Sequence, residues 1–167
     1  MLIREGVLKN NYIKNCNGFV FEELLNVTKI NLRGDPTDKN FLTNIQNILD
    51  ATLPIEPNTS NSNNKLKIIW LGPNEWLIEL YKKEDFDKIF LNLKITLNPQ
   101  NTAITDVTEN RTILKLTGLD LYKLLSKFMI INLDKVLNKE SSVAQTIFVK
   151  VPILIVRNQN QNEKKKY

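Results

Sequence analysis

Residues 27–33 (VTKINLR) alternate between apolar and polar side chains with a period of two. This period predicts a β-strand that buries one of its faces. Gly34 and Asp35 end the strand, and Pro36 stands where a helix can begin. Apolar residues then recur at helical spacing, which predicts a helix that ends before residues 53–57. The residues on its apolar face are Phe41, Leu42, Ile45, Ile48 and Leu49.

A polar segment, residues 58–64 (NTSNSNN), follows the predicted helix. It has no apolar side chain to bury, so we expect a mobile surface loop. Residues 65–71 and 76–80 are apolar runs on either side of a Gly-Pro-Asn-Glu turn, which predicts a β-hairpin. Residues 85–93 place Phe86, Ile89, Phe90 and Leu93 at the spacing of a short helix.

Similar elements are predicted in the later part of the chain. Residues 103–107 and 111–117 have the pattern of two strands about a tight Thr-Glu-Asn turn. Residues 143–156 form one long run rich in β-branched residues, which Pro152 interrupts. Gly118 introduces a predicted helix with Leu121, Leu124, Leu125 and Phe128 on its inner face.

The two parts match in pattern. INLRGD, a helix and LPIEPN match LKLTGLD, a helix and MIINLD, and KLKIIWLGPNE matches VPILIVRNQNQNE. The identity is weak, so a chance similarity of two α+β units is the alternative. We interpret the chain as an N-terminal arm (1–26), one α+β domain (27–157) of two split-βαβ-like halves (27–107 and 111–157), and a polar, lysine-rich tail (158–167). The expected sheet is mostly antiparallel, with helices on one face.

Composition narrows the classes of protein. The 167 residues suffice for one well-buried domain. No segment approaches the roughly 18 apolar residues that a membrane span requires, and the first residues lack the apolar core of a secretory signal. The single cysteine, Cys16, excludes an internal disulfide and fits a reducing, cytoplasmic location. The net charge of +5 includes the lysine run 164–166, and the other basic residues are scattered among acids. We therefore expect a solvated surface with a basic tail and no nucleic-acid site.

The residue types exclude most catalytic chemistry. The chain has no histidine, which removes the commonest general base, the commonest metal ligand and every histidine-activated nucleophile. One cysteine excludes a thiolate zinc site, and the five glycines form no phosphate-binding motif. Neighbouring carboxylates, such as Glu22 with Glu23 and Asp85 with Asp87, are typical of helix starts. We expect no catalytic, cofactor-binding or metal-binding residue on this chain.

Four residues are candidates for a partner interface. Trp70 and Trp76 flank the predicted turn and can share one face of the hairpin. They are interpreted either as core residues, because an aromatic side chain buries up to about 250 Å², or as interface anchors, where tryptophan is enriched. Pro73 fixes the turn between them. Arg111 is expected either to form a local ion pair with Asp106 or to clamp a partner.

Four stretches together carry a family resemblance: INLRGDPTDKNF, LPIEPNTS with WLGPNEWLI, TDVTENRTILKLTG, and SSVAQTIFVKVPILIVR. In this order and spacing the chain resembles the gamma subunit of heterotetrameric sarcosine oxidase over residues 20–157. The most specific elements are the hairpin with both tryptophans, the segment that joins Asp106 to Arg111 and Leu114, and Ala144-Gln145-Thr146.

The resemblance implies a subunit of a complex that oxidatively demethylates sarcosine to glycine and yields peroxide and methylene-tetrahydrofolate. It places FAD, FMN, NAD, zinc and tetrahydrofolate on other subunits, and it implies the large, flavin-carrying subunits and the small zinc subunit as partners. The implied fold is similar to the folate-binding aminomethyltransferase fold. The family pattern continues past the position of Arg157 with a strand and an amphipathic helix, so the second half is expected to be truncated here.

Two other functions remain open at this point. One is a free-standing folate-binding protein, although no pterin-binding carboxylate is assigned to a residue. The other is a binding module that uses the basic tail. We also expect self-association through residues 147–156, because an apolar strand without a neighbour is a template for pairing with another chain.

Overall fold

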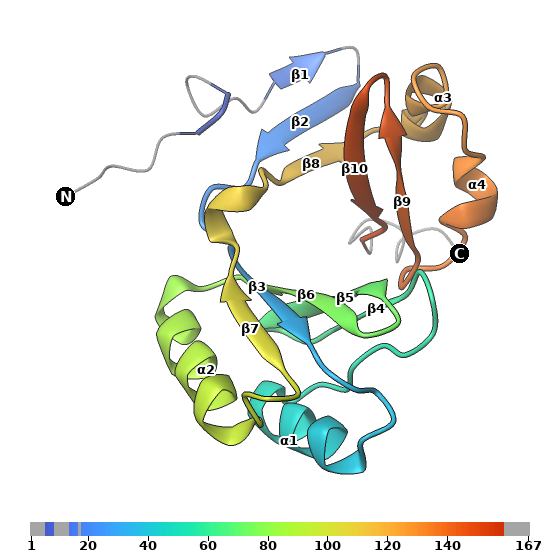
Figure 1. Cartoon of the computed structure of the whole chain (residues 1–167). Coiled ribbons are helices and arrows are strands. Elements are labelled where there is room, and N and C mark those ends of the chain that lie inside the picture. Colours follow the sequence, from blue (N-terminus) through green and yellow to red (C-terminus); the bar gives the residue numbers. More distant parts are fainter. Residues whose placement is uncertain (1–5, 9–13, 17, 159–167) are drawn as a thin grey trace, which may run out of the picture.

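The computed structural model describes residues 6–8, 14–16 and 18–158. The chain has a mixed α+β fold with mostly antiparallel sheets, as the sequence pattern predicts (Figure 1). None of the helices in the described ranges combines the length and the apolar character that crossing a bilayer requires.

A five-stranded antiparallel sheet with the order β4-β5-β6-β3-β7 forms the larger layer. Helices α1 (Lys39–Leu49) and α2 (Lys83–Thr96) pack on one face of this sheet (Figure 1). The core between the sheet and the helices contains Ile30, Leu32, Trp76 and Ile78, all fully buried. The strands are β3 (Thr28–Arg33), β4 (Ser60–Ser62), β5 (Leu66–Gly72), β6 (Glu75–Leu80) and β7 (Ala103–Asp106).

Helix α1 begins and ends where the local chemistry requires it. The Asp38 carboxylate accepts hydrogen bonds from the backbone N–H groups of Asn40 at 2.8 Å and Phe41 at 3.3 Å. Such an N-cap contributes about 1 kcal/mol to helix stability. Asp50 ends the helix in the left-handed region, with φ of 52°. The buried residues Phe41, Ile45 and Leu49 follow at i+4 spacing, so one face of α1 lies in the core.

The rest of the described chain contains a three-stranded sheet, in which two N-terminal strands pair with a later one, and a separate hairpin. The sheet has the order β1-β2-β8, with β1 (Lys14–Cys16), β2 (Phe19–Glu23) and β8 (Leu114–Thr117). The hairpin consists of β9 (Val143–Phe148) and β10 (Val151–Val156). Short helices α3 (Leu121–Leu125) and α4 (Leu133–Val136) follow β8, and the 3₁₀ helix η1 (Thr108–Asn110) precedes it.

The two faces of the β9–β10 hairpin pack against different layers. On one face, Ile153 and Ile155 contact a small core that includes Met129, Leu133 and Leu137. On the other face, Val143, Leu154 and Val156 pack against Ile69 and Leu77 of the five-stranded sheet. The five-stranded sheet is therefore covered by helices on one face and by the hairpin on the other.

Three expectations about secondary structure are wrong. Residues 60–62 of the predicted polar loop form β4, which pairs with β5 and needs no apolar side chain because it lies at the edge of the sheet. β7 and β8 do not form a hairpin with each other, since β7 pairs with β3 and β8 pairs with β2. Residues 143–156 are not one strand but two, joined at Val149 and Lys150.

The turn at Val149 explains why the sequence pattern did not predict the β9–β10 hairpin. Val149 has a φ of 57°, in a region that β-branched residues rarely adopt. Glycine or asparagine would normally mark such a turn. The N–H of Val149 donates a hydrogen bond to the carbonyl of Phe128 at 2.9 Å, which holds the turn in place. Part of the segment expected as an N-terminal arm also has a structural role, because β2 pairs with β8.

Candidate partner interface

Trp76 lies inside the protein. Its side chain is 0% exposed, and its ring packs at a tilt against Phe41, with 5.9 Å between the ring centroids. The indole N–H donates a hydrogen bond of 2.8 Å to the carbonyl of Pro54. Burial of the ring together with a satisfied polar atom is the arrangement of a core tryptophan.

Trp70 and Trp76 are brought together as a cross-strand pair in the β5–β6 hairpin. Trp70 is only partly buried against the same core, so part of its ring faces solvent. Pro73 is exposed at the tip of the hairpin. Of the three candidates on this hairpin, Pro73 is exposed, Trp70 is partly buried and Trp76 is fully buried.

The hairpin tip is tied to β3. The carbonyl of Asn74 accepts a hydrogen bond from the N–H of Gly34 at 3.2 Å. The Glu75 carboxylate accepts one from the Asn31 amide at 2.7 Å and one from the Arg33 guanidinium at 2.8 Å. These contacts hold the tip against β3, although an exposed ion pair itself contributes only about 0–1 kcal/mol to stability.

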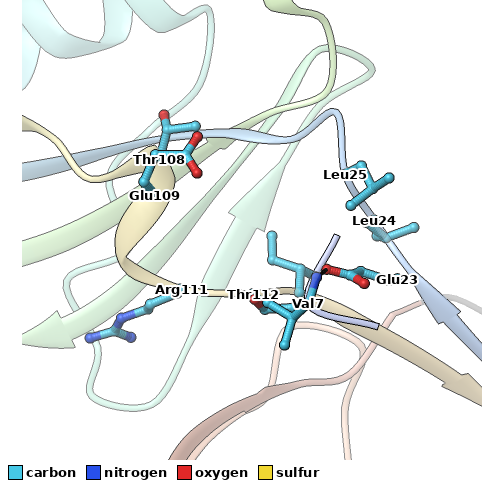
Figure 2. Close-up of a pocket in the computed structure, with 9 residues that line it drawn as sticks. Val7, Glu23, Leu24, Leu25, Thr108, Glu109, Arg111 and Thr112 are labelled. Carbon is cyan, nitrogen blue, oxygen red and sulfur yellow. Dashed lines mark hydrogen bonds between the residues drawn. The ribbon is translucent and has the colours of Figure 1, made fainter. Parts of the chain in front are cut away.

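Arg111 lies on another segment, between η1 and β8, and is exposed. No ion pair joins it to Asp106, so that expectation is wrong; the Asp106 carboxylate instead accepts the N–H of Thr108 at 2.9 Å. Arg111 borders a small cavity of about 80 Å³, whose lining also includes Glu23 and Glu109. Figure 2 shows the Arg111 guanidinium directed away from Glu23. Ligand pockets typically measure about 300–1,000 Å³, so this cavity is too small for a flavin or a folate.

The carboxylates of β2 have structural partners. Glu23 accepts hydrogen bonds from the backbone N–H groups of Val7 and Leu8, both at 2.9 Å. Glu22 lies 3.5 Å from the ammonium group of Lys115 on the neighbouring strand. The spacing of these two residues indicated a helix start. Both lie on strand β2 instead. Within the described ranges, no group of three or more histidine, cysteine, aspartate or glutamate side chains is arranged to hold a metal ion.

A row of charged residues lies on the sheet face that the β9–β10 hairpin covers. Lys29, Glu79 and Lys67 are cross-strand neighbours on β3, β6 and β5. Lys29 is 1% exposed and Lys67 is 8% exposed. The Lys67 ammonium donates a hydrogen bond to the Asn158 side chain, just beyond β10. The alternation of apolar and polar residues indicated that this face is exposed to solvent. It is covered instead, and the sequence of a single strand does not show which layer packs on it.

Burial changes the proton affinities of this row. Burial raises the pKa of the Glu79 carboxyl, while the charges of Lys67 and Lys29 oppose that change. Burial lowers the pKa of Lys67, and Glu79 opposes it. The pKa of Tyr81 is raised by burial and by the nearby charge of Glu79. Each charge in the row partly offsets the desolvation of its neighbours, so the three residues act as one unit.

The comparisons with known proteins agree with this geometry. A family model described as sarcosine oxidase, gamma subunit family, matches residues 33–163. A chain in the solved structure of heterotetrameric sarcosine oxidase from Corynebacterium sp. U-96, in complex with pyrrole 2-carboxylate, has a TM-score of 0.75 and 20% identity. That match covers 86% of this chain and 72% of the other, and it shows a shared fold. A search among curated proteins found no match. Because the family model spans well over half of the sequence, the chain belongs to the sarcosine oxidase gamma subunit family.

Proposed function

We propose that this chain is the non-catalytic gamma subunit of a heterotetrameric sarcosine oxidase complex, which oxidatively demethylates sarcosine to glycine and yields peroxide and methylene-tetrahydrofolate. The observation that carries the proposal is the family match over residues 33–163. In this complex FAD, FMN, NAD, zinc and tetrahydrofolate belong to the other subunits. The partners of this chain are the large, flavin-carrying subunits and the small zinc subunit.

The proposed contact surface includes the β5–β6 tip and Arg111. Pro73 and Arg111 are exposed, and Trp70 is partly exposed, so all three have surface to offer. The network of Glu75 with Asn31 and Arg33 supports this role because it holds the tip rigid before binding. The finer fold belongs to the same proposal: two split-βαβ-like halves, similar to the folate-binding aminomethyltransferase fold.

The test is co-expression of the tagged chain with the large, small zinc and remaining subunits of a heterotetrameric sarcosine oxidase. We expect the tagged chain to co-purify with a flavin-containing complex that produces peroxide from sarcosine. Purified alone, it should neither retain a flavin absorption band after gel filtration nor turn over sarcosine. A chain that stays separate from the flavin-carrying subunits at micromolar concentrations would contradict the proposal.

The isolated chain also tests the alternative function, a free-standing folate-binding protein. Tetrahydrofolate is titrated into the isolated chain, and binding is followed by tryptophan fluorescence, with both tryptophans in the N-terminal part of the fold. The proposal expects no saturable change. Saturable binding without any association with flavin-carrying subunits would favour the alternative.

A further inference from the structure

The turn end of the β9–β10 hairpin carries apolar side chains into solvent. Ile147, Val149 and Val151 are 58%, 62% and 60% exposed. Phe128, in the segment that follows α3, is 46% exposed and lies beside this turn (Figure 1). Its carbonyl accepts the N–H of Val149 at 2.9 Å, and its ring centroid lies 5.4 Å from that of Phe148. The four exposed side chains, Phe128, Ile147, Val149 and Val151, are called the apolar tip below.

The apolar tip is exposed on both faces of the hairpin. Successive residues of a strand point to opposite faces. Ile147 therefore shares a face with Val143, which packs against the five-stranded sheet, and Val151 shares a face with Ile153, which packs in the smaller core. Towards the turn the two faces leave these layers and stay apolar. An element that is apolar all round is suited to a pocket, because a flat surface would cover only one of its faces.

The turn itself is strained at its most exposed point. Val149 has a φ of 57° and is the first of the two turn residues, Val149 and Lys150. Glycine usually occupies such a position in a two-residue hairpin turn, and a β-branched side chain there is unfavourable. Burial within the chain does not offset this cost, since the Val149 side chain is mostly exposed. Strain of this kind clusters at binding sites.

The charges around the apolar tip have one sign. Residues 121–131 and 141–156, which form the tip and its support, contain no aspartate or glutamate and include Lys123, Lys127 and Lys150. Lys127 and Lys150 are exposed and directly follow Phe128's neighbouring position and Val149 in the sequence. We propose that the apolar tip inserts into an apolar pocket of a partner subunit whose rim carries carboxylates. An apolar centre with a charged rim is the usual anatomy of a protein interface, and rim charges of opposite sign speed the encounter.

The charge count favours a protein pocket over an anionic membrane. Basic segments that hold a protein on anionic lipid contain about four to eight lysines or arginines, and the two stretches around the tip supply three. The identity of the partner as a subunit of the oxidase rests on the proposed function. The surface is additional to Pro73 and Arg111, which lie on other segments of the chain.

The experiment measures the affinity of the full-length chain for the purified remaining subunits of a heterotetrameric sarcosine oxidase, by biolayer interferometry. Val149→Gly removes the side chain and also relieves the positive φ. Its dissociation constant should rise at least about tenfold, as for loss of an interface anchor, while its melting temperature is no lower than that of the native chain. A residue with a merely structural role would not separate affinity from stability in this direction.

Ile147→Ala provides a second test with a matched control. Its dissociation constant should rise several-fold, whereas Leu91→Ala on α2 should bind as the native chain does. The two side chains are 58% and 56% exposed, so the pair loses comparable apolar surface at different places. Replacing Lys127 and Lys150 by glutamate should slow association several-fold at low salt, and Lys88→Glu, another exposed lysine, should not.

Each outcome decides between the occupants of the tip. If the native chain binds the subunits and the tip variants bind equally well, the tip proposal falls and the proposed function stands. If the native chain does not bind the subunits, both fall. Co-sedimentation with phosphatidylserine vesicles that Ile147→Ala abolishes would assign the tip to a membrane and overturn the pocket. A second copy of the chain seated on the tip within the complex, shown by cross-linking at Lys150, would also overturn it.

Discussion

The indole N–H of Trp76, a residue of the main core, donates a hydrogen bond of 2.8 Å to the carbonyl of Pro54, a partly buried residue. This contact links the β5–β6 hairpin to the segment that follows α1. The bond satisfies the indole N–H of the fully buried Trp76, because a buried polar group without a partner carries a desolvation cost. The two tryptophans of the hairpin therefore differ in role although they pair across its strands.

Replacing Trp76 tests this difference. Trp76→Ala should lower the free energy of unfolding by about 3–5 kcal/mol, and Trp76→Phe by about 1–3 kcal/mol through the lost donor. Trp70→Ala should cost less, since Trp70 is partly exposed. Urea unfolding followed by circular dichroism measures all three. If Trp76→Ala left stability unchanged but abolished co-purification with the large subunit, an interface role for Trp76 would be favoured instead.

Gly34 is constrained by the main core. A Cβ atom at this position would lie 2.4 Å from two ring atoms of Phe41, and Phe41 is 4% exposed. Gly34→Ala should therefore destabilise the chain by about 1–3 kcal/mol through overpacking. Gly72→Ala is the control, because its nearest new contact is 3.9 Å away. Equal melting temperatures for the two variants would show that the Phe41 ring moves aside at little cost.

The sequence predicted the elements whose apolar residues lie on one face. The helical spacing of Phe41, Ile45 and Leu49 predicted α1, and the apolar runs on either side of the Gly-Pro-Asn-Glu turn predicted β5 and β6. Contacts between distant segments were not predictable in the same way. β4 is polar and depends on β5, and the positive φ of Val149 is held by the carbonyl of Phe128.

The candidate site shows the same division. The hairpin position of Trp70 and Trp76 follows from local pattern, whereas the burial of Lys29 and Lys67 depends on the β9–β10 hairpin far along the chain. No feature of either strand alone indicates that its polar face is covered.

Glu79 should give the chain a specific pH dependence. Its folded-state pKa is raised above the ordinary value of 4.5, so the folded state holds its proton more tightly than the unfolded state. Its contribution to stability is therefore full below pH 4.5 and is lost as the pH rises through the raised pKa. Urea unfolding of the native chain and of Glu79→Gln across this range measures the difference, with Lys29 and Lys67 present in both.

The Glu79→Gln variant should lack this decline, because glutamine does not titrate. In this variant the buried Lys29 and Lys67 lose their counter-charge, which changes its free energy of unfolding at every pH. The comparison therefore uses the slope of stability with pH and not the absolute stability. Lys67 acts in the opposite direction, because its pKa is lowered by burial. Between that lowered pKa and the ordinary value of 10.5, only the unfolded state keeps the proton, so stability should rise with pH there. Parallel pH profiles for the two proteins above pH 4.5 would contradict the burial of a charged Glu79.

The surface candidates should affect assembly and not folding. Arg111→Ala and Pro73→Ala change exposed side chains, and such changes usually alter stability by less than about 0.5 kcal/mol. If these residues contact the flavin-carrying subunits, both variants should reduce co-purification while their melting temperatures stay near that of the native chain. Lys88→Ala, on the exposed side of α2, is the control for loss of a surface charge. Unchanged assembly in both variants would remove Pro73 and Arg111 from the interface.

In the absence of a partner, the free chain should self-associate through the segment 147–156. The relevant edge is that of β10, where Leu154 and Val156 turn their backbone groups away from β9, and Pro152 removes one N–H from it. Unpaired apolar edges template pairing with another chain, and the lysines at 164–166 oppose it by charge repulsion. At about 1 M salt the screening length falls to about 3 Å, so association should increase.

Light scattering at about 100 µM protein, a range in which exposed edges aggregate, measures the mass at low and high salt. A native chain that stays monomeric at high salt would show that the edge of β10 is already covered.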